Sequence, residues 1–459
     1  MAVTIKNPLT IVKAAGGGGY NPDPGVAKDP QKVYEAERPS DWLKMPEIGA
    51  SEDNVIYLLL HRGATATTNF PFSFYSATTS GQAVKYEFGT VTNGAFVPDD
   101  TLTETKTGNV NIDKLIPASA FGNATADGHV QLIIKISSEY NLTMARFRYS
   151  YSNNGPSQTA LVEFSGKATQ ITSVLRENGQ DPYRFTKLRF FKLQGTNQIT
   201  SMSRLFQNCY NLRAVLDLDT SHTTNLSYVF SSCNSLAAIP AINTSSASNL
   251  SSAFYGCRSL TAVPSLNLNA ATTVEQMFSN CEALVAPPTL SNTGSVTNWG
   301  QLFNYCRALK QAPTLDTSAG TVFSSMFRDN YALLNETGVI DFRGYDFSSN
   351  TSEYGPNLTA VAGPGTFYLP DADKWPATGI PRYFQFAFAA VNNADYAINI
   401  VISDGTTMIP LQTSATTTFG SGSSYAYICV YVPDALLATY QADTNWATLG
   451  TRLKAISEL

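Results

Sequence analysis

Apolar residues return at a fixed interval through the middle of the chain. Six phenylalanines are spaced 24, 24, 24, 25 and 24 residues apart, and each is followed six positions later by a leucine. In the first five units a cysteine stands three positions after the phenylalanine. The three columns are Phe206, Phe230, Phe254, Phe278, Phe303 and Phe327; Cys209, Cys233, Cys257, Cys281 and Cys306; and Leu212, Leu236, Leu260, Leu284, Leu309 and Leu333. A register kept over six units indicates stacked repeats.

Each repeat is predicted to contain a short helix and a short strand. In the second unit Leu226, Val229, Phe230 and Cys233 fall at i, i+3, i+4 and i+7, which is one face of a helix. Ser, Thr and Asn residues precede this segment, as helix starts prefer, and an extended stretch around Pro240 follows it. Because one unit is too small to bury its own apolar face, we expect the units to stack, with Phe on Phe, Cys on Cys and Leu on Leu.

The single extra residue of the repeat register falls between Leu290 and Phe303, where a loop at 292–295 can absorb it. The pattern Phe-x-x-Cys-x-x-Leu, followed by Pro-x-Leu and Thr-Ser, resembles the BspA-like leucine-rich repeats of bacterial surface proteins and some phage proteins. The resemblance covers about residues 190 to 345. The last unit departs from it at Asn330 and Leu334, which fits a terminal, capping repeat.

The region before the repeats is predicted to be all-β. Short strand-like runs alternate with turn signals, and Asn93-Gly94 is typical of a two-residue hairpin turn. The predicted strands are Asn54–Leu60, Val84–Phe88, Val130–Ile136, Ala145–Tyr151 and Ala160–Phe164. A sandwich of about seven strands is the natural solution. Residues 38–46, Arg-Pro-Ser-Asp-Trp-Leu-Lys-Met-Pro, resemble the entry to β-domains of phage tail-fibre and prophage proteins.

The C-terminal region is predicted to contain strands at Phe384–Phe388, Tyr396–Ile402 and Tyr425–Val432, with a hairpin signal at Asp404-Gly405. The ending from Tyr431 onward resembles the Tyr-Val-Pro…Tyr…Trp…Ile tail that closes BspA-like repeat proteins. Physically it is a strand followed by an amphipathic helix, which would cover the open end of the stack.

These patterns predict a multi-domain chain in which an N-terminal all-β sandwich precedes an α/β leucine-rich-repeat solenoid that ends in a C-terminal β/α cap. The predicted divisions are an anchoring segment at 1–34, the sandwich at 35–175, six repeats at 176–345 and the cap at 346–459.

The composition of the chain argues against nucleic acid and a membrane as binding partners. The net charge of -5 and the 14% of charged residues lack the basic excess that nucleic-acid binding needs, and no apolar run is long enough for a membrane helix. The first residues lack a signal-peptide pattern, so we expect synthesis in a host cytoplasm without export by that route. Six cysteines are too few for a disulfide scaffold, and the column is expected to be buried free thiols, with no metal and no cofactor.

Catalytic patterns are weak, and the sequence predicts that the protein is not an enzyme. His61, His129 and His222 are scattered, without a partner pattern for nucleophile, base or metal chemistry. The acid pairs Asp99-Asp100 and Asp217/Asp219 could in principle hydrolyse glycosides, but solvated loop acids are much commoner.

Four aromatic residues depart from the repeat consensus: Tyr210, Tyr255, Trp299 and Tyr305. They are either packing adjustments, which we favour, or receptor-binding residues, since rigid rings offer stacking area to sugars and proteins. A Gly- and Pro-rich N-terminal segment has little reason to be ordered alone, so we expect it to dock on something larger. The candidate anchoring residues are Ile5, Pro8, Leu9, Ile11 and Tyr20.

The resulting hypothesis is a bacteriophage virion protein, such as a tail fibre, head fibre or other appendage, located in the phage particle. Its N-terminal segment would contact other virion proteins, and its repeats would bind a host surface glycan or protein. We also expect the protein to be a homo-oligomer. A bacterial surface adhesin with leucine-rich repeats is the main alternative. A glycan depolymerase and a decoration protein without a receptor are further ones.

Overall fold

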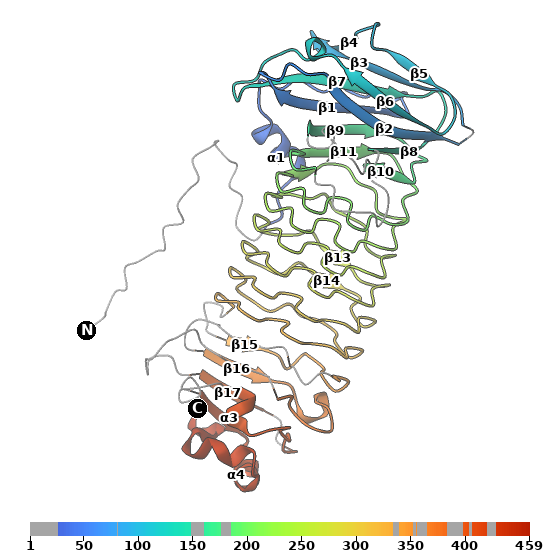
Figure 1. Ribbon diagram of the computed structural model, residues 1–459. Coiled ribbons are helices and arrows are strands. Elements are labelled where there is room, and N and C mark those ends of the chain that lie inside the picture. The colour runs from blue at the N-terminus through green and yellow to red at the C-terminus, as the bar shows by residue number, and fades with distance from the viewer. Residues whose placement is uncertain are drawn as a thin grey trace.

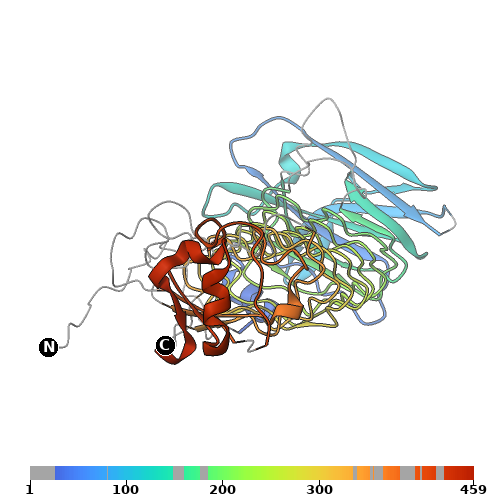
Figure 2. The same ribbon diagram turned by 90° about the horizontal axis from the view of Figure 1, so that it is seen from below.

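The computed structural model describes residues 26–79, 81–147, 160–175, 185–333, 339–351, 355, 365–382, 398–403, 406–419 and 428–459. They form an elongated molecule with paired sheets at one end, a stack of coils in the middle and a parallel sheet at the other end (Figure 1). Seen from below, the coils overlie one another and the paired sheets project beyond them (Figure 2).

The N-terminal part contains a large sheet and a four-stranded sheet. The large sheet has the strand order β12-β11-β9-β1-β7-β3-β4, with β5 also paired to β3, and the small one has the order β10-β8-β2-β6. The elements are α1 (Pro30–Glu37), β1 (Val55–Gly63), β2 (Phe70–Thr78), β3 (Val84–Thr92), β4 (Ala95–Pro98), β5 (Glu104–Lys106), β6 (Val110–Ile116), η1 (Ala118–Ala120), β7 (His129–Ser137), β8 (Leu142–Phe147), β9 (Leu161–Lys167), β10 (Ser173–Leu175), β11 (Phe190–Gln194) and β12 (Ala214–Val215).

The two sheets pack face to face through aromatic side chains. Phe72 of β2 meets Phe88 of β3 edge-on, with ring centroids 5.9 Å apart, and both rings are buried. The five strands predicted from the sequence in this region are confirmed as β1, β3, β7, β8 and β9, although the end of the predicted 145–151 strand lies outside the described residues. Asn93 and Gly94, with φ of 53° and 81°, form the predicted turn between β3 and β4, because both positions need a left-handed backbone.

The large sheet continues into the stack of coils. β9 pairs antiparallel with β1 but parallel with β11, which in turn pairs parallel with β12 of the first coil. Buried rings follow the same route, because Phe164 stacks on Phe191 at 4.8 Å and Phe191 meets Phe206 at 4.9 Å. The predicted division between 175 and 176 falls between β10 and β11, and it stays a prediction.

The coils contain no helix in the described residues 185–333, so the predicted α/β fold class is wrong. In the second coil the backbone makes successive tight turns, with N–H groups bonded three residues back, such as Val229 to Leu226. The alternate N–H groups bond to the next coil, such as Phe230 to the carbonyl of Ala253 at 2.8 Å. Tyr228, with φ of 57°, makes one of the left-handed bends that this path requires. The structure is therefore a β-solenoid, in which alternate N–H groups of these turn segments bond to the neighbouring coil.

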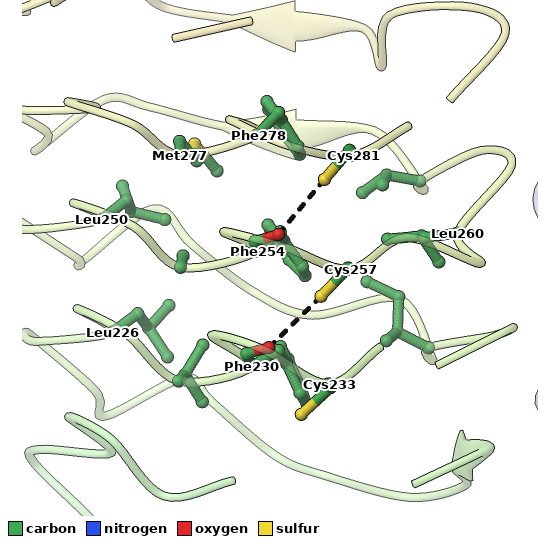
Figure 3. Packing of buried hydrophobic residues seen from close by; sticks show 14 of the residues in the cluster. Leu226, Phe230, Cys233, Leu250, Phe254, Cys257, Leu260, Met277, Phe278 and Cys281 are labelled. Carbon is green, nitrogen blue, oxygen red and sulfur yellow. Dashed lines mark hydrogen bonds between the residues drawn. The ribbon is translucent and has the colours of Figure 1, made fainter. Parts of the chain in front are cut away.

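Stacking of equivalent side chains, in contrast, is confirmed. The six ladder phenylalanines stack with centroids 5.3, 5.5, 5.4, 5.4 and 6.0 Å apart and interplanar angles of 16° or less. Figure 3 shows three of these rings, Phe230, Phe254 and Phe278, with Cys233, Cys257 and Cys281 beside them. The extra residue is absorbed where predicted, since Ser291 pairs with Asn267, 24 residues back, and Asn298 bridges Thr273, 25 residues back.

Two short paired strands and the C-terminal sheet complete the described elements. They are β13 (Leu266–Asn267), β14 (Leu290–Ser291), β15 (Val339–Asp341), β16 (Gly365–Leu369), η2 (Ala372–Lys374), β17 (Ile398–Ile402), α3 (Ala415–Phe419), β18 (Ile428–Val432), η4 (Asp434–Leu436), α4 (Leu437–Ala442), η5 (Trp446–Arg452), β19 (Leu453–Ala455) and η6 (Ile456–Glu458).

The predicted β/α cap is also wrong. β15 to β19 form one sheet whose neighbours are all parallel, so the winding of the solenoid continues to the last residues. α3 and α4, of five and six residues, are single turns beside it. Tyr440 and Trp446 are fully buried, and Trp446 Nε1 donates to the carbonyl of Ile409 at 2.8 Å. The predicted strand at 384–388 and the signal at 404–405 lie outside the described residues.

Candidate functional site

The cysteine column is part of the core. All five ladder cysteines are buried, and none of them forms a disulfide. The thiol of Cys257 donates to the carbonyl of Phe230 in the preceding coil at 3.2 Å, and Cys281 donates to that of Phe254 at 3.1 Å (Figure 3). Each such carbonyl also accepts the N–H three residues on in its own coil, as Phe230 does from Cys233. The column therefore supplies weak hydrogen bonds between coils, as expected for small buried side chains.

These thiols are expected to resist alkylation in the folded protein. Burial raises the pKa of Cys281 to about 12 and raises that of Cys257 well above its usual value, and the thiolate is the reactive form. With iodoacetamide at pH 8, Cys429, which is half-buried, should be labelled first, and the ladder cysteines only after denaturation. Mass spectrometry of the peptides measures this; labelling of Cys257 as fast as Cys429 would show that the coils open readily.

The four aromatic candidates do not share one environment. Trp299 is fully buried, and its Nε1 donates to the carbonyl of Val296 at 3.0 Å, so it cannot contact a receptor and its role is packing. It occupies a buried column four positions before the ladder phenylalanine, where the other coils carry Met202, Leu226, Leu250, Val274 and Phe323. Tyr210, Tyr255 and Tyr305 are half-buried. Tyr210 lies in the first coil, Tyr255 in the third and Tyr305 in the fifth.

Tyr305 belongs to a polar surface cluster on the fifth and sixth coils, here called the distal patch: Tyr305, Arg307, Arg328, Asp329 and Tyr331. Tyr305 is hydrogen-bonded to Asp329, whose negative charge raises the pKa of the Tyr305 hydroxyl. Asp329 also pairs with Arg328 at 3.1 Å. The guanidinium of Arg307 lies 5.7 Å from the ring centroid of Tyr331, which is 37% exposed. Sequence reasoning found only Tyr305, which departs from the small residues that the other coils carry two positions after the ladder phenylalanine. The other four members gave no such signal, because Arg307 and Tyr331 stand in a column that also holds Tyr210, Arg258 and Glu282.

A second polar cluster lies beneath the N-terminal strap, which we define as α1 and residues 38–46. Arg38 Nε pairs with Glu163 Oε2 at 2.9 Å, and the Tyr34 hydroxyl donates to Glu163 Oε1 at 2.8 Å. Burial raises the pKa of Glu163 in spite of both partners. Trp42 packs between His61 and Phe190, at centroid distances of 4.7 and 6.2 Å. Residues 38–46 thus hold together strands β1, β9 and β11 of the large sheet.

Two clefts flank the strap. The larger, of about 610 Å³, lies between α1, the strap and strands β9 and β11, and the other, of about 470 Å³, lies between the strap and the β3–β4 hairpin. Charged side chains of the larger cleft have neighbouring partners, since Lys192 pairs with Asp217 at 3.6 Å and Glu35 accepts a hydrogen bond from Gln31 at 2.8 Å. Among the described lining residues a hydroxyl and a carboxylate do meet, at Tyr34 and Glu163, but Arg38 also pairs with that carboxylate.

The structure brings two of the three histidines together, with the ring centroids of His61 and His129 6.0 Å apart, and leaves His222 apart from them. His61 is 3% exposed, and burial lowers its pKa to about 4, so it is neutral at pH 7. His129 lies 3.0 Å from Asp127 and 3.4 Å from Lys187, and His222 is exposed. Within the described chain, no group of three or more His, Cys, Asp or Glu side chains is placed to hold a metal ion.

The acid pairs also serve local structure. Asp99 accepts from the N–H of Thr101 at 3.0 Å and Asp219 from that of Ser221 at 2.9 Å, which are turn-forming bonds. Asp217 points instead to Lys192. The candidate anchoring residues Ile5, Pro8, Leu9, Ile11 and Tyr20 lie outside the described residues. None of the described helices is long and apolar enough to cross a membrane.

The stacked coils coincide with the part of the chain that resembles known proteins. Residues 189–289 and 285–351 match the family described as "Mycoplasma protein of unknown function, DUF285". The match spans the repeats and supports their BspA-like interpretation, and its description names no activity or partner. Comparisons with curated proteins and with solved structures gave no match.

Proposed function

We propose that the protein is a rigid attachment protein, a structural component of a bacteriophage appendage that is fixed by its N-terminal segment and presents the solenoid to a host surface receptor. The observation that carries the proposal is the continuity of the core. One sheet joins the sandwich to the first coil, and an unbroken aromatic stack runs from Phe164 to Phe327. A core of this kind keeps the two ends of a molecule at a fixed distance.

The second candidate is a bacterial cell-surface adhesin. The family description favours it, because it names a protein of a bacterium. The same rigid solenoid serves both functions, and the two differ in where the protein is found and in what holds it there. A decoration protein would be found on particles but would not bind cells. A depolymerase would release oligosaccharides from the cell surface.

The experiment compares the full chain with a variant lacking residues 1–25, which keeps the helix cap at Asp29. Immunoblots of gradient-purified particles and of washed cell envelopes locate the protein. We expect full-length protein on particles, no truncated protein on them, and unchanged circular dichroism of the truncated chain. Recovery in the envelope alone supports the adhesin, and normal assembly of the truncated chain overturns N-terminal anchoring.

A further inference from the structure

We propose that the distal patch binds a carboxylate-bearing sugar, of the uronic acid class, within an acidic surface glycan. This inference rests on the proposed attachment function and specifies its ligand. It starts from the charges, because the patch holds two guanidinium groups, those of Arg307 and Arg328, for the single carboxylate of Asp329. The chain as a whole carries a net charge of -5.

Arg307 is the group available to a ligand. It is exposed, it lies against the ring of Tyr331, and in the described chain no carboxylate lies within ion-pair distance of it. In the equivalent column two coils earlier, Arg258 is paired with Glu282 at 3.3 Å. A planar guanidinium without a protein partner suits a carboxylate, which it can hold through two parallel hydrogen bonds.

Tyr305 supplies a second argument, because its backbone is unfavourable for its side chain. It has φ of 59°, in the left-handed region that favours glycine and asparagine. At the equivalent position the other coils carry Asn208, Ser232, Gly256, Asn280 and Asp329, which are small residues. A large, half-exposed ring at a bend where the other coils carry small residues points to a role outside the fold.

The composition of the patch favours a sugar over a protein. It spans two adjacent coils and offers two tyrosine rings and two arginines, without an exposed aliphatic side chain among its five members. Stable protein interfaces bury about 800 Å² on each partner around an apolar centre. Tyrosine rings that stack on a pyranose, beside an arginine that holds its carboxylate, match the chemistry of an acidic sugar.

The test measures binding of the full chain to oligogalacturonate, with a neutral maltooligosaccharide as the comparison probe, by isothermal titration calorimetry. We expect binding of the acidic probe only, weakened by salt. Arg307→Ala should lower affinity about tenfold, the loss of one charge-assisted contact. Tyr305→Asn should weaken binding several-fold while the melting temperature stays equal or rises, because asparagine is the better residue at this bend.

The matched control is Tyr228→Asn, since Tyr228 also has a left-handed backbone, with φ of 57°, and lies 5.0 Å from the guanidinium of Arg204, but in the second coil. It should leave affinity unchanged. Failure of the wild-type chain to bind the acidic probe, or equal binding by Arg307→Ala, overturns the proposal. A lower melting temperature for Tyr305→Asn assigns that ring to packing and also counts against it. Attachment to host cells without acidic-glycan binding would overturn this inference and leave the attachment function standing.

Discussion

Replacing Phe254 with alanine should lower the free energy of unfolding by about 3–5 kcal/mol. The ring is fully buried and lies 5.5 Å from Phe230 and 5.4 Å from Phe278, so its loss opens a cavity bordered by both neighbours. The backbone of each coil is held to the next by hydrogen bonds, which limits how far the coils can close around the gap. Urea unfolding followed by fluorescence and circular dichroism measures the change.

The neighbouring residue provides the control. Tyr255 follows Phe254 directly but is half-buried, so Tyr255→Ala should cost about 1 kcal/mol or less. Because a solenoid is stabilised chiefly by nearest-neighbour contacts, Phe254→Ala should also divide the transition into two steps, one for the coils on each side. A loss below 1 kcal/mol in a single sharp transition would contradict the assignment of the aromatic stack as the main stabilising element.

The columns of the core could be predicted from the sequence, but the path of the backbone could not. Phe230 and Cys233 point inward with helical spacing, yet the segment is a series of turns. Its alternate N–H groups find acceptors only in the next coil. The sequence of a single repeat does not show that the carbonyl groups of the next coil will lie within hydrogen-bond distance. Turns that are costly alone become favourable when many equal coils satisfy one another.

The roles of surface residues could likewise be predicted only in part from the sequence. Trp299 departs from the repeat consensus as Tyr305 does, but one fills a core column and the other lies in the distal patch. Spacing from the ladder phenylalanine separates the two, since position −4 is apolar in every coil and position +2 is otherwise small. The role of the strap was not visible in the sequence, because Arg38 and Glu163 lie 125 residues apart.

Replacing Arg38 with alanine should destabilise the protein by about 3–5 kcal/mol at pH 8, as expected when one partner of a buried ion pair is removed. The side chains of Arg38 and Glu163 are 12% and 4% exposed, and Tyr34 alone would remain to satisfy the carboxylate. Burial already raises the pKa of Glu163 with Arg38 present, so its removal should raise that pKa further.

The dependence on pH distinguishes the buried charge from simple loss of packing. A carboxyl whose pKa is raised by folding favours the folded state below its unfolded pKa, and this contribution is lost as the pH rises through the folded pKa. The deficit of Arg38→Ala should therefore be largest at pH 8 and shrink toward pH 5. The double variant Arg38→Ala with Glu163→Gln, which carries no charge there, should recover part of the stability at pH 8 and lose this pH dependence. If the double variant were as unstable as Arg38→Ala at pH 8, the loss of stability would come from lost packing of the Arg38 side chain. An unpaired Glu163 carboxylate would then not be its cause.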